Sequence, residues 1–158
     1  MSISDMIVVM KDGVIQQIGQ PQTVYDDPVN LFVAQFLGTP PINVFTGRVK
    51  GEKLYIGGEA VLDAAGISDQ EVYAAIRPEG FELNAGGAFT CGLDRVEVMG
   101  RDISVVSSHE NAVSETIRAI ISAENRLELS GSTVRFDLKP NKVFLFHRET
   151  GARLRPGV

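Results

Sequence analysis

The side chains in this sequence best suited to catalysis or metal binding are one cysteine and two histidines. Cys91 is isolated, and His109 and His147 stand far apart in the sequence. A zinc site needs three or four converging ligands, and a nucleophilic triad needs a serine with a paired histidine and acid. Because neither pattern occurs, the sequence predicts no catalytic residue and no metal site.

Phosphate-transfer chemistry lacks its usual motif as well. A glycine-rich loop of the form G-x-x-x-x-G-K-[ST] would cradle nucleotide phosphates, and the sequence contains none. The stretch Leu129-Ser130-Gly131-Ser132 is interpreted as a turn between strands. We therefore expect no cofactor-binding residue and no ATP hydrolysis by these 158 residues.

The charged residues that flank Pro78 are the one candidate regulatory site. One interpretation places Arg77 and Glu79 at a strand end, where proline interrupts the ladder and both charges are solvated. The other places them in a polar network at a domain or subunit contact. The sequence leaves both interpretations open, and Arg77 and Glu79 are candidates for a regulatory or dimer contact.

The amino-acid composition argues against several classes of function. The chain is 44% hydrophobic and 22% charged with a net charge of −5, which argues against a nucleic-acid partner. A single cysteine fits a reducing compartment, and no apolar run reaches the ~18 residues of a membrane span. We expect a cytoplasmic protein.

The first 41 residues carry a hairpin, two short helices and a linker. Ile7 to Gly19 predicts a β-hairpin that turns at Asp12-Gly13, and its unbroken apolar run Ile7–Met10 predicts cover on both faces. Pro21 begins a first helix, and Asn30 caps a second over 31–37. Because a lone hairpin is marginal in water, we expect the rest of its sheet to lie upstream of Met1.

From residue 42 onward the pattern is that of short, β-branched strands separated by turn residues. It predicts a mainly β fold, a small antiparallel barrel of the oligonucleotide-binding (OB) type, with the domain boundary after Pro41. The expected strands are 44–49, 53–56, 71–77, 89–99, 103–107, 115–122, 133–138 and 143–146. We expect the run at 143–146 to be core.

The first 47 residues resemble the end of the ATP-binding domain of ABC importers that power carbohydrate uptake. The resemblance rests on the hairpin, on Pro21-Gln22-Thr23-Val24-Tyr25-Asp26-Asp27-Pro28 and on Phe32-Val33-Ala34-Gln35-Phe36-Leu37-Gly38. Further on, Ile76-Arg77-Pro78-Glu79, the stretch 94–106 and the closing segment 136–154 resemble the regulatory domain of the same family. That resemblance implies residues 1–41 as a remnant of the ATP-binding domain and 42–158 as an OB-type, transport-associated domain.

The resemblance also implies a function. The chain would be the regulatory and dimerising part of an importer's ATP-binding subunit, paired with a second copy and, through the complete subunit, with membrane permeases. ATP and Mg²⁺ would belong to that complete subunit, which would sit on the inner face of the cell membrane. A regulatory protein or metabolite is a further expected partner.

Other functions stay open at this point. The barrel could bind a small ligand such as an oxyanion, a sugar phosphate or a metabolite, or the subunit could serve a polyamine or glycerol-phosphate importer. A literal oligonucleotide-binding role is disfavoured by the net charge of −5, and an independent enzyme ranks last. The transported solute is not encoded in these residues.

Overall fold

The hairpin turn forms as the sequence predicts. In the computed structural model, which describes residues 5–123 and 131–155, strands β1 (Ile7–Lys11) and β2 (Val14–Gly19) pair antiparallel with Lys11 opposite Val14. Asp12 and Gly13 have φ angles of 51° and 79°, the positive values that a two-residue type I′ turn requires.

Cover on both faces of this hairpin was expected, with the rest of its sheet upstream of Met1, and within the described residues one face is covered. Val9 is fully buried, whereas Val8 is 48% and Met10 50% exposed. Successive side chains in a strand point to opposite faces, and only the Val9 face is packed, in a small apolar cluster with Val24 and Val33.

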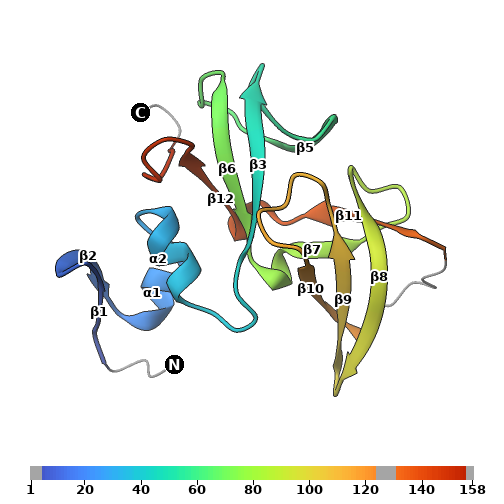
Figure 1. The fold of residues 1–158 in the computed structure, drawn as a ribbon, viewed down its shortest axis with the longest axis horizontal. Coiled ribbons are helices and arrows are strands. Elements are labelled where there is room, and N and C mark those ends of the chain that lie inside the picture. The colour runs from blue at the N-terminus through green and yellow to red at the C-terminus, as the bar shows by residue number, and fades with distance from the viewer. Residues whose placement is uncertain (1–4, 124–130, 156–158) are drawn as a thin grey trace.

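Two short helices follow, α1 (Pro21–Asp26) and α2 (Leu31–Phe36). Asn30 caps α2 as predicted, because its side-chain oxygen accepts a hydrogen bond from Val33 N at 2.9 Å. Leu37, expected to be helical, lies just beyond the helix as its extended C-cap. Opposite the hairpin, Ala34 of α2 packs with Val44 and Phe144, so the helices lie between the hairpin and the larger β structure (Figure 1).

The β structure consists of two five-stranded antiparallel sheets. The first has the order β12-β6-β3-β4-β5 and contains β3 (Asn43–Lys50), β4 (Lys53–Ile56), β5 (Glu59–Asp63), β6 (Gln70–Ile76) and β12 (Val143–His147). The second has the order β10-β9-β8-β11-β7 and contains β7 (Phe81–Leu83), β8 (Phe89–Met99), β9 (Asp102–Ser108), β10 (Ile117–Ser122) and β11 (Thr133–Leu138). Its outer strands β10 and β7 approach each other, which nearly closes it into a barrel.

One apolar core joins the two sheets. Phe45 meets Phe89 edge-to-face with ring centroids 5.3 Å apart, and Phe81 meets Phe136 at 5.0 Å. The predicted core run from Val143 to Phe146 is buried throughout. The prediction of a mainly β fold with a small OB-like antiparallel barrel is confirmed.

The expected strand boundaries need three corrections. Strands β5 and β7 were not predicted, because each is short and lies beside glycine or proline turns. Arg77 lies beyond the end of β6, before a 3-10 turn, η1 (Pro78–Gly80). β10 begins at Ile117, two residues later than expected. A second 3-10 turn, η3 (Pro140–Lys142), precedes β12.

Leu129 and Ser130, interpreted as part of a turn, lie outside the described residues. Of the helices in the described part of the chain, none has both the length and the apolar character needed to span a membrane.

Candidate functional site

Arg77 lies where the two helices meet the first sheet. Arg77 is only 1% exposed to solvent. Nη1 donates hydrogen bonds to the backbone oxygens of Ala34 at 3.0 Å and Leu37 at 2.8 Å, and Nη2 donates to the backbone oxygen of Tyr25 at 2.8 Å. One guanidinium therefore holds the carbonyl ends of both helices.

The chemistry of helix ends explains why a cation suits this position. The last carbonyls of a helix lack partners within the helix and carry a partial negative charge. Arg77 supplies both the donors and the positive charge, and its guanidinium carbon lies 3.9 Å from the centroid of the Tyr25 ring. Burial, opposed by Tyr25 and nearby acids, lowers the pKa of Arg77 from its ordinary value, yet an arginine stays charged in proteins.

Glu79 belongs to the same junction. The Tyr25 hydroxyl donates to Glu79 Oε2 at 2.6 Å, and Lys142 Nζ lies 3.7 Å from that oxygen. Lys142 Nζ also lies 3.9 Å from the carboxylate of Asp26. Burial first, and then the hydrogen bond to Glu79, raise the pKa of the Tyr25 phenol above its ordinary value.

A second polar attachment ties the end of α1 to the chain's final segment. Asp27 Oδ1 accepts from Arg155 Nη2 at 2.7 Å and from Arg153 Nη1 at 2.9 Å. Arg153 also donates to the backbone oxygen of Pro28 at 3.0 Å and lies over the Phe144 ring at 4.7 Å. The hydrogen bond from Arg155 is the main cause of the lowered pKa of Asp27.

The junction bears on the two interpretations of Pro78 and its neighbours, and a regulatory or dimer contact at Arg77 and Glu79 stays a prediction. A solvated Arg77 is wrong, because this side chain is buried in a polar network between the helical segment and the first sheet. Glu79 shares the network through Tyr25. Its members Tyr25 and Lys142 were missed, since residues 52 or more positions apart give no local sequence signal.

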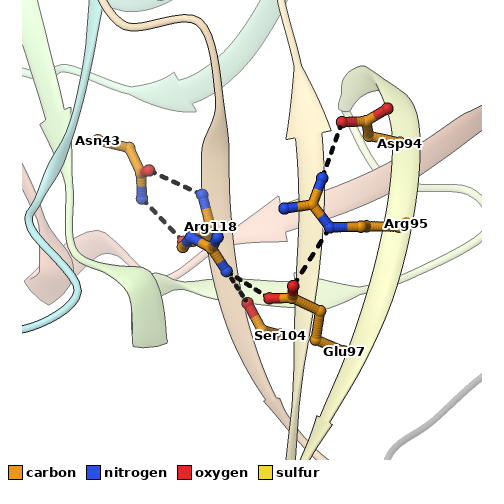
Figure 2. A network of polar contacts seen from close by, with 6 residues as sticks. All are labelled: Asn43, Asp94, Arg95, Glu97, Ser104 and Arg118. Carbon is orange, nitrogen blue, oxygen red and sulfur yellow. Dashed lines mark hydrogen bonds and ion pairs between the residues drawn. The ribbon is translucent and has the colours of Figure 1, made fainter.

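A separate network joins the start of β3 to the edge of the second sheet (Figure 2). The Asn43 side chain pairs with the backbone of Arg118, with its Nδ2 3.0 Å from Arg118 O and its Oδ1 3.0 Å from Arg118 N. It thus replaces one rung of a β-ladder. Arg118 Nη1 in turn donates to Glu97 Oε1 at 2.6 Å, and Arg95 donates to Glu97 Oε2 at 3.2 Å.

The reactive residue types lie apart from these networks. Cys91 is buried, and burial raises its thiol pKa to about 12, which keeps the thiol protonated and poorly nucleophilic. His109 Nδ1 accepts from Asn111 N at 3.0 Å, while His147 is exposed on β12. Within residues 5–123 and 131–155, no group of three or more His, Cys, Asp or Glu side chains could hold a metal ion.

The chain is similar in sequence to ATP-binding proteins of bacterial import systems. No family model matches the chain. It is 33% identical over 162 residues to the sn-glycerol-3-phosphate import ATP-binding protein UgpC of Shigella sonnei, covering 98% of this chain and 44% of that protein. It is 31% identical over 177 residues to the diacetylchitobiose uptake system ATP-binding protein MsiK of Streptomyces coelicolor, covering 98% of this chain and 47% of that protein.

The chain spans less than half the length of these curated relatives. Among solved structures, the cytoplasmic molybdate-binding protein ModG aligns with a TM-score of 0.43 and 17% identity, over 65% of this chain and 94% of that one. The chain's homologues are thus ATP-binding proteins of ABC importers.

Proposed function

We propose that this chain, homologous along 98% of its length to import ATP-binding proteins, is the regulatory end of such a subunit in an importer of sugars or glycerol phosphate. That homology is the observation that carries the proposal. Residues 1–41 would close the ATP-binding domain, and 42–158 would form the regulatory domain.

The exposed face of the hairpin supports this division of the chain. Val8, Met10, Ile15 and Ile18 are 48 to 54% exposed, and the strand register places them together on the face opposite Val9. An apolar patch of this kind marks a surface that another element covers. In the complete subunit the remaining strands of the ATP-binding domain would cover it.

The Arg77 junction gives the regulatory domain a mechanical role. One buried guanidinium links α1, α2 and the end of β6, and the attachment of Asp27 to Arg153 adds a second link. A movement of the helices would therefore carry the sheets with it. We propose that the regulatory domain follows the opening and closing of the ATP-binding domain in this way.

Pairing with a second copy would make this movement useful. If the regulatory domains of two subunits stay in contact, the ATP-binding domains remain at high effective concentration while they separate. The complete subunit would use ATP and Mg²⁺, bind membrane permeases and lie peripherally on the inner face of the membrane. A regulatory protein or metabolite would bias the resting state.

The relatives' names guide the choice of solutes to test. They are named for sn-glycerol-3-phosphate and diacetylchitobiose import. The experiment places the complete protein that contains this sequence, with its permeases, in proteoliposomes, and measures uptake of labelled glycerol 3-phosphate and of a panel of sugars. We expect ATP-dependent uptake of one of these solutes.

The matched control is the 158-residue chain alone, which should release no phosphate from Mg-ATP. A complete protein that binds no ATP and copurifies with no permease would overturn the proposal.

A further inference from the structure

The outward face of the first sheet has two different halves. Near β12 it is apolar and covered by α2, through Val44 and Phe144. Toward β4 it opens into a groove of about 790 Å³. Its main side chains are Thr46, Arg48, Lys50, Lys53, Tyr55 and Arg148.

The lining of this groove is strongly basic in a chain whose net charge is −5. Four of its side chains are cationic, and Glu71 is the only acidic one. Lys50 and Lys53 are directly paired across the β3–β4 ladder. Like charges in directly opposed strand positions repel each other, so a bound anion between them would relieve that repulsion.

The cations of the groove are not neutralised by the protein itself. Arg48 lies opposite Glu71 in the β3–β6 register, but in the described part of the chain neither it nor Lys50 or Lys53 forms an ion pair. All three are exposed. They therefore remain available to a ligand.

Two of the acids that lie close by accept hydrogen bonds from backbone groups. Asp69 Oδ1 accepts a hydrogen bond from Gly51 N at 2.9 Å, and Glu52 Oε1 accepts from Gly66 N at 3.0 Å. Asp63 is paired with Lys53 in the β4–β5 register, without a salt bridge. None of the three lines the groove.

Arg148 is held rigidly at one wall. Its Nη2 donates to the backbone oxygens of Gly47 at 2.8 Å and Val72 at 2.9 Å, and its Nε donates to Val72 at 3.1 Å. Among the described residues Nη1 donates no hydrogen bond. A guanidinium fixed in this way presents its remaining donors without a further loss of side-chain entropy, and a planar fork suits phosphate oxygens.

The groove also has groups for the neutral part of a ligand. Asn111 and Thr46 form a hydrogen-bonded pair, with Asn111 Nδ2 3.2 Å from Thr46 Oγ1, and both line the groove with the Tyr55 ring. Amide and hydroxyl groups match hydroxyls, and an aromatic ring matches the apolar face of a sugar. The volume lies within the ~300–1,000 Å³ of small-molecule sites, more than an inorganic anion needs.

We propose that this groove binds the phosphate monoester of a small polyol or sugar. Arg48, Lys50 and Lys53 would hold the phosphate, with Arg148 at the wall, and Thr46 and Asn111 would face the hydroxyls. The site is formed by residues of this chain alone. It therefore stands or falls independently of the proposed importer function.

The test titrates the 158-residue chain with glycerol 3-phosphate, with inorganic phosphate and with glycerol. Binding is measured by calorimetry and by changes in the amide NMR shifts. We expect glycerol 3-phosphate to bind at least as tightly as inorganic phosphate and to shift the amides of Thr46, Gly47 and Asn111. Glycerol lacks the charge, so it should show no measurable binding and should not shift these amides.

Two variants and a control locate the binding site. Arg48→Ala and Lys53→Ala remove exposed side chains, so the fold should persist. Each should weaken binding of glycerol 3-phosphate by about tenfold, or about 1.4 kcal/mol, because each removes one charge-assisted contact to the phosphate. Arg101→Ala, an exposed arginine at the β8–β9 turn, should bind like the unaltered chain.

Four results would overturn the proposal, three of them from the titrations. These three are equal binding of glycerol and glycerol 3-phosphate, unchanged affinity in Arg48→Ala, and an equal loss of affinity in Arg101→Ala. Binding of an acidic peptide at these amides without any binding of glycerol 3-phosphate would also overturn it, because the groove would then be a protein contact.

Discussion

The guanidinium of Arg77 lies 3.9 Å from the centre of the Tyr25 ring, and its Nη2 donates to the backbone oxygen of the same tyrosine at 2.8 Å. The two residues are 52 positions apart in the sequence. This stacked and hydrogen-bonded pair joins the helical segment to the first sheet, and we expect mutation and pH to change stability through it.

Removing the Arg77 side chain should destabilise the whole chain. Arg77→Met retains an apolar stem but leaves the carbonyls of Tyr25, Ala34 and Leu37 without a donor. We expect a loss of about 3 kcal/mol in the free energy of unfolding, within the range for hydrogen bonds to a buried charged group. Urea denaturation measures this loss.

The control for that experiment is Arg95→Ala. Arg95 contacts Asp94 and Glu97, but its side chain is 51% exposed, and exposed ion pairs contribute at most about 1 kcal/mol. If Arg77→Met were no more destabilising than Arg95→Ala, the Arg77 junction would not hold the two parts together.

Alkaline pH should weaken the same junction through Tyr25. Burial and the hydrogen bond to Glu79 raise the pKa of this phenol, so the folded state holds the proton more tightly than the unfolded state. This contribution is complete below pH ~10, the unfolded value, and is lost as pH rises further.

Tyr25→Phe removes both the hydrogen bond and the titration. Between neutral pH and pH ~11, the free energy of unfolding of the variant should therefore fall less than that of the unaltered chain. Thermal unfolding followed by circular dichroism across that range measures the difference. Parallel profiles for the two proteins would show that the phenol does not titrate with folding.

Mild acid should destabilise the chain through His109. Burial lowers the pKa of this imidazole below 6.5, where it packs against the rings of Phe45 and Phe89 at centroid distances of 6.0 and 5.1 Å. A lowered pKa in the folded state means that stability is complete above pH ~6.5 and falls as pH drops below it.

His109→Gln, which cannot titrate, isolates this effect. Between pH 7 and pH ~5, where carboxylates stay ionised, its free energy of unfolding should change less than that of the unaltered chain. His147→Gln serves as the matched control, because His147 is exposed. An acid sensitivity that survives His109→Gln and disappears in His147→Gln would contradict the assignment.

A backbone contact at Gly87 gives a prediction that involves no charge. A Cβ atom at Gly87 would lie 2.5 Å from both the backbone carbon and the oxygen of Phe136, whereas one at Gly58 would meet nothing within 4 Å. Gly87→Ala must push the loop away from β11, and we expect a loss of about 2 kcal/mol or more.

Gly58→Ala should change stability by no more than about 0.5 kcal/mol, because the added methyl group enters open space at a surface position. The comparison is made by urea denaturation of both variants. Equal stabilities would mean that the close approach of Gly87 to Phe136 does not exist in solution.

The features of the fold that depend on neighbouring residues could be predicted from the sequence. The Asp12-Gly13 turn, the Asn30 cap and the buried run at 143–146 depend on neighbouring residues, and all three are confirmed. Their signals are turn chemistry and apolar patterning, which act within a few positions.

The long-range features could not be predicted in the same way. The burial of Arg77 depends on Tyr25, Ala34 and Leu37, which the chain brings to it only after folding. The basic groove likewise combines β3, β4 and Arg148. The run Arg77-Pro78-Glu79 indicated a candidate site, but the residues that contact it share no recognisable sequence pattern.

Coupling through Arg77 is tested most directly by solute uptake in proteoliposomes that contain the complete protein with Arg77→Met, at a temperature where circular dichroism shows it folded. From the proposed importer function we expect Mg-ATP hydrolysis to persist while ATP-driven uptake falls to background, because α1 and α2 would no longer carry the proposed regulatory domain with them. Uptake equal to that of the unaltered protein would contradict a coupling role for this junction.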